Sequence, residues 1–154
     1  MKHYREILSV LQNFLDLLIG LRKVRLNIPR NETITAVISH RREFVSCVCI
    51  SLFACEQVFG ARQPLPQFLP SARRAFKILD SHMEDQIRRS RAASHPTCMG
   101  LSLAYAFAEL DLLGRLVDTN EELLDLGRKL FGTSAWFHEE VVSYMSDQDG
   151  QMVD

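Results

Sequence analysis

The sequence predicts an all-α fold: a single helical bundle of five to six helices with one proline-rich extended connection at about residues 61–70. Hydrophobic residues make up 47% of the 154 residues, enough to fill the core of one domain. Only seven glycines and five prolines occur, and three of the prolines stand between residues 64 and 70, so the rest of the chain is free to form long helices. Apolar residues recur at helical spacing in successive segments, and no segment alternates with a period of two. We expect one helical domain at residues 1–145 and a frayed acidic tail at residues 146–154.

The first two predicted helices cover residues 3–26 and 32–59. The first carries a broad apolar stripe at i, i+3, i+4 and i+7 spacing, and Pro29 would end it. For the second, Asn31 is a plausible N-cap and Gly60 a natural stop. Its stretch 44–55 is apolar nearly all round, so we expect this helix to be the central one. A helix that spans a membrane needs about 20 residues, and we therefore interpret this shorter stretch as part of a buried core helix.

The connection at residues 61–70 should be extended, because three prolines within seven residues exclude a helix. We expect Leu65, Phe68 and Leu69 to pack onto the bundle and to clamp the helices on either side. Ser71 is the predicted N-cap of a third helix at residues 72–91, whose narrow apolar stripe predicts a position on the surface.

The C-terminal part is predicted to hold three more helices. A fourth helix is expected at residues 99–117. Thr119 and Glu122 then have the spacing of a capping box, which would open a fifth helix that Gly132 ends. Residues 134–145 form a predicted short sixth helix, which carries Trp136 and Phe137.

Charge is distributed unevenly along the chain although the net charge is only −1. Residues 1–100 hold fifteen Lys and Arg against eight Asp and Glu, and residues 101–154 hold three against eleven. The simpler interpretation is that the two parts attract each other within one fold. The alternative is a basic surface for anionic lipid or another acidic partner. The candidate contact residues form three clusters: Arg22, Lys23 and Arg25; Arg73, Arg74 and Lys77; Arg88, Arg89 and Arg91. Nucleic acid is not favoured as a partner, because the chain is nearly neutral and its aromatic residues lie on core-facing positions.

No motif for catalysis, cofactor binding or metal binding occurs in the sequence. Phosphate-binding loops, zinc-protease and calcium-loop patterns are absent, and the five histidines are scattered. His95 and Cys98 lie three residues apart in a predicted loop, where an inert thiol is a better interpretation than a catalytic pair. The N-terminal residues do not form a signal peptide, so we expect a cytoplasmic, reducing setting with free thiols. We therefore expect neither an enzyme nor a bound cofactor.

The proline-rich segment resembles a known family. Residues 64–76 read Pro-Leu-Pro-Gln-Phe-Leu-Pro-Ser-Ala-Arg-Arg-Ala-Phe and follow an apolar helix that begins after Arg-Arg-Glu at 41–43. They are similar to the PLPPYLPSA-type signature in the C-terminal region of fungal brefeldin A sensitivity-like membrane proteins, which are related to aromatic acid exporters and the fusaric acid resistance superfamily. Gln67 and Phe68 stand where that family tends to have Pro and Tyr. The resemblance extends over residues 4–140, and its motif comprises Pro64, Leu65, Pro66, Phe68, Leu69, Pro70 and Ser71.

The resemblance implies a cytosolic accessory or regulatory domain that acts in the assembly or regulation of a transporter-like membrane protein. Its partner would be such a membrane-protein parent, with contact to the inner leaflet as a further option. The chain is not expected to be a transporter by itself, and its oligomeric state is left open. The alternative is a helical module that binds a small molecule in a pocket lined by Phe53, Phe59, Phe76 and Tyr105.

Overall fold

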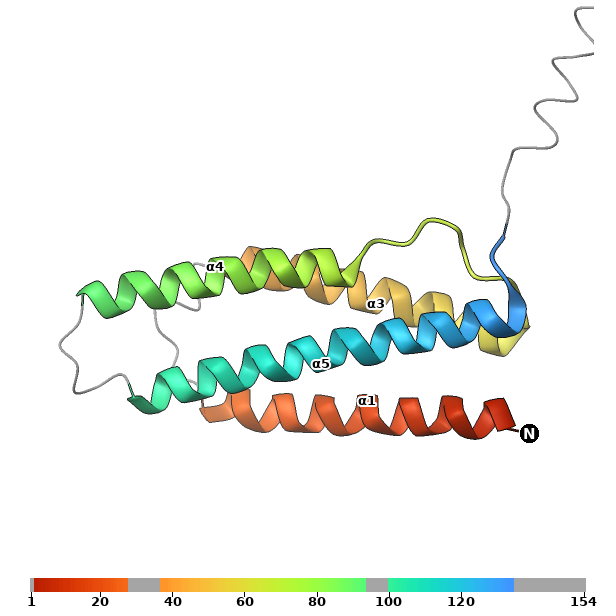
Figure 1. Ribbon diagram of the computed structural model, residues 1–154, viewed down its shortest axis with the longest axis horizontal. Coiled ribbons are helices and arrows are strands. Elements are labelled where there is room, and N and C mark those ends of the chain that lie inside the picture. The colour runs from red at the N-terminus through yellow and green to blue at the C-terminus, as the bar shows by residue number, and fades with distance from the viewer. Residues whose placement is uncertain (1, 28–36, 94–99, 135–154) are drawn as a thin grey trace, which may run out of the picture.

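The chain folds as an all-helical bundle, and the computed structural model describes residues 2–27, 37–93 and 100–134. Four helices lie in this part of the chain: α1 (Lys2–Asn27), α3 (Ile38–Ala61), α4 (Ala72–Ala93) and α5 (Gly100–Phe131). They run along one common direction with α1 at one side, α5 next to it, and α3 and α4 beyond α5 (Figure 1). The predicted all-α class is therefore confirmed. The expected N-cap at Asn31 and the expected helix at 134–145 lie outside the described residues.

The helix that organises the bundle is α5, and the prediction that residues 32–59 form the central helix is wrong. Helix α5 contacts each of the other three described helices, whereas α3 contacts α4 and α5 only. Several large apolar side chains of α3 remain outside the core; Phe53 is 62% exposed and Val45 is 51% exposed. An apolar composition alone does not place a helix at the centre, because packing also requires a neighbour on each face.

The predicted break at the capping box does not exist, because residues 100–131 form one helix of 32 residues. Thr119 is 4% exposed, and its hydroxyl donates a hydrogen bond to the carbonyl of Arg115 at 2.9 Å, one turn earlier in the same helix. The same oxygen accepts a hydrogen bond from the side-chain amide of Asn13 on α1 at 3.3 Å. Burial of this turn against α1 therefore outweighs the local capping preference of Thr119.

The core consists of two clusters along the length of the bundle. The first cluster contains Phe14 and Leu17 of α1 together with apolar residues of α3, α4 and α5, and the rings of Phe44 and Phe76 lie 6.0 Å apart. The second lies toward the end of α5 and includes Ile7 of α1, together with Leu65 of the connection between α3 and α4. The connection is thus part of the core at one position.

A buried carboxylate ties three helices together. Glu109 on α5 is 2% exposed and accepts a hydrogen bond from the guanidinium of Arg41 on α3, whose side chain is 11% exposed. The guanidinium of Arg25 on α1 approaches the other carboxylate oxygen at 3.6 Å. Both arginines belong to the basic part of the sequence and Glu109 to the acidic part, in agreement with the simpler interpretation of the charge asymmetry.

One described helix, α3, is long and apolar enough to cross a membrane by length and composition. Part of it is buried inside the bundle, where Phe44 and Val48 pack in the first core cluster. Core helices of other proteins pass the same test, so this is weak evidence for a membrane span.

Candidate functional site

The connection between α3 and α4, residues 62–71, is the most distinctive feature of the surface. It begins at Arg62, whose φ of 55° is left-handed and ends α3 two residues after the predicted stop at Gly60. The N–H of Leu65 donates to the carbonyl of Gly132 at 3.0 Å, and the N–H of Ser134 donates to the carbonyl of Leu65 at 2.9 Å. These two bonds hold the middle of the connection beside the end of α5. Gly132 adopts a φ of 75°, which turns the chain there and suits a residue without a Cβ atom.

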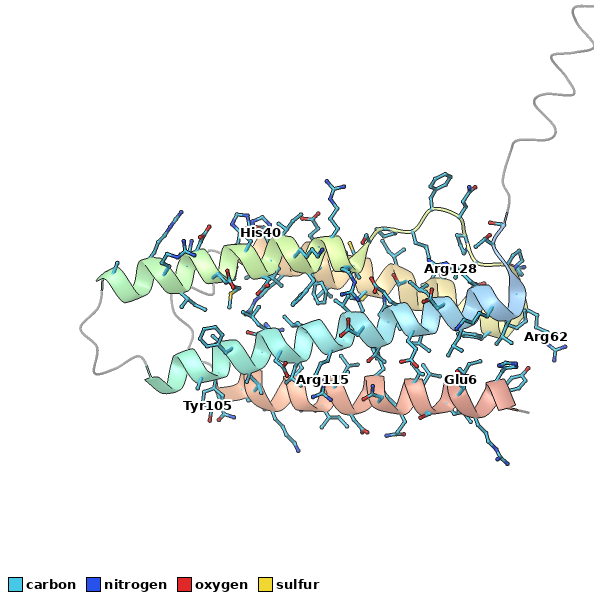
Figure 2. The ribbon with its side chains drawn as sticks, in the orientation of Figure 1. Glu6, His40, Arg62, Tyr105, Arg115 and Arg128 are labelled. Atoms are coloured by element: carbon cyan, nitrogen blue, oxygen red, sulfur yellow. The ribbon has the colours of Figure 1, made fainter. Side chains whose placement is uncertain are left out.

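Two leucines of the connection face the core, and its other side chains face outward. Leu65 is fully buried in the second core cluster, and the half-buried Leu69 packs against the same cluster. Phe68, in contrast, is 85% exposed, so the prediction that it clamps the bundle is wrong. The prolines and the two glutamines of the connection are exposed as well, and the chain bends at Gln67, between Leu65 and Phe68. Figure 2 shows side chains of this connection projecting away from the helices.

The exposed side of the connection forms a shallow surface around Phe68. A depression of about 530 Å³ beside the ring is lined by Gln63, Pro64, Pro66, Gln67, Phe68 and Ser134. We call these six residues the proline surface. Downstream, the Ser71 hydroxyl accepts a hydrogen bond from the N–H of Arg74 at 3.1 Å and its carbonyl accepts one from Ala75 at 3.1 Å, which caps the start of α4.

The three basic clusters do not form one surface. The first lies at the end of α1 and the third at the end of α4, and these two helix ends lie at the same end of the bundle (Figure 1). The second lies at the start of α4, beside the connection. Exposed side chains without an ion pair among the described residues are those of Arg22, Lys23, Arg74, Lys77 and Arg89. The side chain of Arg91 lies outside what the structure describes.

The remaining described members of these clusters contact carboxylates of the same chain, and the exposed guanidinium of Arg88 lies 3.9 Å from the carboxylate of Asp85. Besides the contact of Arg25 with Glu109, the guanidinium of Arg73 donates to the carboxylates of Glu121 and, at 2.7 Å, Asp118 on α5. These hydrogen bonds, with Glu121 contributing most, raise the pKa of Arg73 above its ordinary value. Arg73 therefore fastens α4 to α5 and is a poor candidate for binding a partner.

The four aromatic residues proposed to line a pocket are not brought together. Phe53 is exposed on α3, and Phe59 packs against Phe131 with ring centroids 6.3 Å apart in the second cluster. Phe76 lines a different hollow between α4 and α5, where Tyr105 is not among the lining residues.

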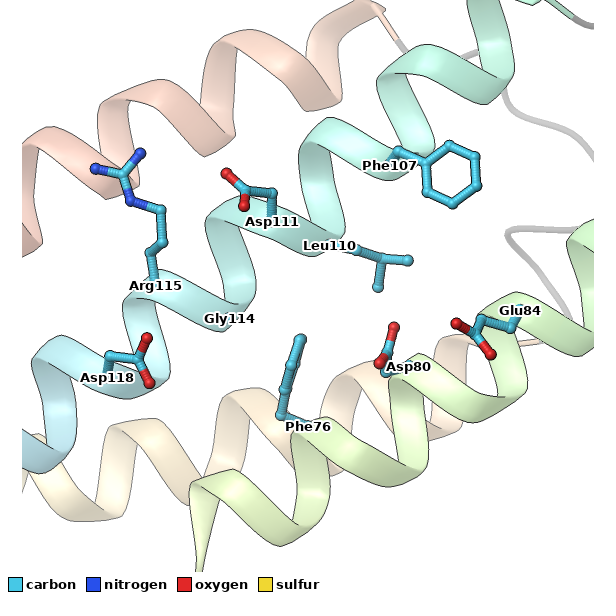
Figure 3. Close-up of a pocket in the computed structure, with 9 residues that line it drawn as sticks. All are labelled: Phe76, Asp80, Glu84, Phe107, Leu110, Asp111, Gly114, Arg115 and Asp118. Carbon is cyan, nitrogen blue, oxygen red and sulfur yellow. The ribbon is translucent and has the colours of Figure 1, made fainter.

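That hollow has a volume of about 400 Å³ and an acidic lining (Figure 3). Asp80 and Glu84 line it from α4, and Asp111 and Asp118 from α5, against the single basic side chain of Arg115. The excess of carboxylates disfavours an anionic ligand such as an aromatic acid. Within the described residues, no three His, Cys, Asp or Glu side chains are placed so that they could hold a metal ion.

Two described cysteines differ in exposure. Burial raises the pKa of the Cys55 thiol to about 11, because the thiolate would lose its hydration in the second core cluster. Cys49 is exposed on α3. His95 and Cys98, considered as a reactive pair, lie outside the described residues.

Sequence reasoning missed the exposure of Phe68. A proline-rich extended segment has three residues per turn, which would place Leu65 and Phe68 on one side, whereas the chain bends at Gln67 between them.

Comparison of the whole chain with known proteins finds no matching family model, no matching curated protein and no matching solved structure.

Proposed function

We propose that this chain is a non-catalytic accessory domain that binds a transporter-like membrane protein of the family it resembles, and that it does so through the proline surface. The domain would act on the cytoplasmic side, peripheral to the membrane, in assembly or regulation of that protein. The observation that carries the proposal is the 85% exposed ring of Phe68 on an anchored segment.

The anchoring favours binding because it reduces the entropy lost when a partner docks. Leu65 is fully buried, and its backbone is hydrogen-bonded to residues 132 and 134. Prolines 64, 66 and 70 restrict the backbone on either side of Phe68. A rigid, exposed aromatic side chain is the type of residue that dominates the binding energy of protein interfaces. The resemblance rests on these same residues, which is why we assign the contact to them.

Charge beside the proline surface favours an acidic partner. Arg74 and Lys77 lie in the first two turns of α4, directly after the connection, and both side chains are exposed. Neither has an ion pair among the described residues. Basic residues at the rim of an interface accelerate association with an acidic surface and make that association sensitive to salt.

A co-flotation experiment tests this proposal. The purified chain is mixed with proteoliposomes that carry a brefeldin A sensitivity-like membrane protein truncated after its last span, and with empty vesicles of the same lipid composition. We expect the chain to float with the proteoliposomes alone, and Phe68→Ala to weaken this binding at least about tenfold, as for an interface hot spot.

Phe53→Ala is the matched control, since Phe53 is also a largely exposed phenylalanine (62%) but lies on α3. It should bind as the unmodified chain does. Equal flotation with empty anionic vesicles would instead assign the chain to the lipid surface. If the chain does not float with the proteoliposomes, or if both variants lose binding equally, a contact through Phe68 is refuted.

A further inference from the structure

Helix α1 carries two apolar stripes, and only one of them is buried among the residues that the structure describes. The first consists of Ile7, Val10, Phe14 and Leu17, which are buried in the two core clusters. The second contains only large side chains that are 38–66% exposed: Tyr4, Leu8, Leu11, Leu15 and Leu18. We call these five residues the outer stripe.

The outer stripe has the spacing of a coiled-coil seam. Its members follow one another at intervals of four, three, four and three residues, and Arg22 continues the series after another four. A heptad repeat of this kind keeps a row of side chains facing one straight neighbouring helix. Four consecutive leucines at these positions are more regular than scattered apolar residues of an ordinary surface, and a continuous exposed apolar row marks an interaction site.

No described helix of the chain covers this row. Among the described helices α1 contacts only α5, and α1 lies at the outer side of the bundle (Figure 1). Helix α3 exposes Ile38, Val45, Ile50 and Phe53, none of which is a leucine, and α4 exposes Ile78 alone among its described large apolar side chains. The exposed leucines of the described residues all lie on α1.

We propose that the occupant is a second copy of this chain, whose α1 packs antiparallel against the outer stripe. Antiparallel pairing centred on residue 13 places Leu8 against Leu18 of the second copy and Leu11 against Leu15, and the two-fold axis repeats both contacts. The same register sets Tyr4 against Arg22 of the other copy at each end, where the guanidinium can lie on the ring. Every layer of the seam then has a compatible partner.

Avoidance of a like-charge contact favours this orientation. Parallel pairing in register would place Arg22 against Arg22 of the second copy, a like-charge contact in the seam. A lipid surface fits the middle of the stripe less well, because membrane-binding helices carry an excess of Lys and Arg beside the apolar face. Residues 8–18 contain no Lys or Arg and one Asp, and the basic residues of α1 lie toward its two ends.

Sedimentation velocity over a concentration series tests the dimer. The unmodified chain should shift from the mass of one chain, 17.6 kDa, to twice that mass as concentration rises. Leu11→Glu with Leu15→Glu should remain monomeric throughout, with an unchanged helical circular-dichroism signal because both side chains already face solvent. The control is Ser9→Glu with Gln57→Glu, which adds the same charge at two exposed polar positions and should still dimerise. A monomer at every concentration, or an unchanged dimer in the leucine variant, would overturn the proposal.

Cross-linking tests the orientation. Chains with Tyr4→Cys and chains with Arg22→Cys are mixed under oxidising conditions, and the linked peptides are identified by mass spectrometry. Antiparallel packing predicts that most disulfide-linked peptides join position 4 of one chain to position 22 of the other. Predominant self-linking of the Tyr4→Cys chain would show parallel packing and overturn the assigned register.

The leucine variant should keep its Phe68-dependent flotation, so failure of the dimer and failure of the proposed function are separate results.

Discussion

Replacing Leu65 and Phe68 separately by alanine probes the two sides of the connection. The residues are three positions apart in one segment, yet Leu65 is fully buried and Phe68 is 85% exposed. Leu65→Ala removes three carbon groups from the second core cluster. At about 0.8 kcal/mol per buried group this transfer costs about 2.4 kcal/mol, and the remaining cavity adds to it.

We therefore expect Leu65→Ala to lower the free energy of unfolding by about 2.5–4 kcal/mol. Part of the cavity should persist, because Leu65 lies beside Gly127, which has no side chain of its own to fill the space. Phe68→Ala should change the free energy by less than about 1 kcal/mol, as surface substitutions do. The larger residue thus has the smaller effect, which is the reverse of what residue size alone predicts.

Urea unfolding followed by circular dichroism measures both values, provided that the slope of free energy against urea is the same in the three proteins. A loss above about 1 kcal/mol for Phe68→Ala would show that its ring packs onto the bundle, as the sequence pattern first suggested. A loss below about 1 kcal/mol for Leu65→Ala would show that the connection is not anchored, and the entropic argument for the proline surface would then fail.

Two further predictions concern the buried ion pair and the thiols. Glu109→Ala leaves the guanidinium of Arg41 buried without its carboxylate, so the free energy of unfolding should fall by about 3–5 kcal/mol. Arg25→Ala changes an exposed side chain and should lower it by less than about 1 kcal/mol in the same urea assay. Equal effects of the two substitutions would contradict the assigned burial. Iodoacetamide at pH 8 should modify the exposed Cys49 rapidly and Cys55 only after unfolding, because burial raises the pKa of Cys55 to about 11 and leaves little thiolate. Peptide mass spectrometry measures both labelling rates. Comparable labelling of the two cysteines in the folded protein would contradict this prediction.

The contrast between Thr119 and Ser71 illustrates how far local signals predict helix ends. Both residues have the side chain of a good N-cap, and the sequence assigns that role to each. Ser71 follows three prolines that exclude a helix before it, and its hydroxyl accepts from the N–H of Arg74. Thr119 has no such breaker before it, and contact with Asn13 of α1 stabilises a continuous α5. The deciding interaction is more than 100 residues away in sequence, so a local pattern could not contain it.

The sequence by itself determined that this chain is all-helical, because apolar residues recur at helical spacing and the prolines are gathered in one segment. Only the tertiary structure decided which stripe of α1 is buried and which faces outward. Both stripes have heptad spacing and large apolar side chains, and what distinguishes them is the position of α5 along one flank of α1. A helical period specifies a face, whereas the presence of a neighbour on that face depends on how the other helices pack.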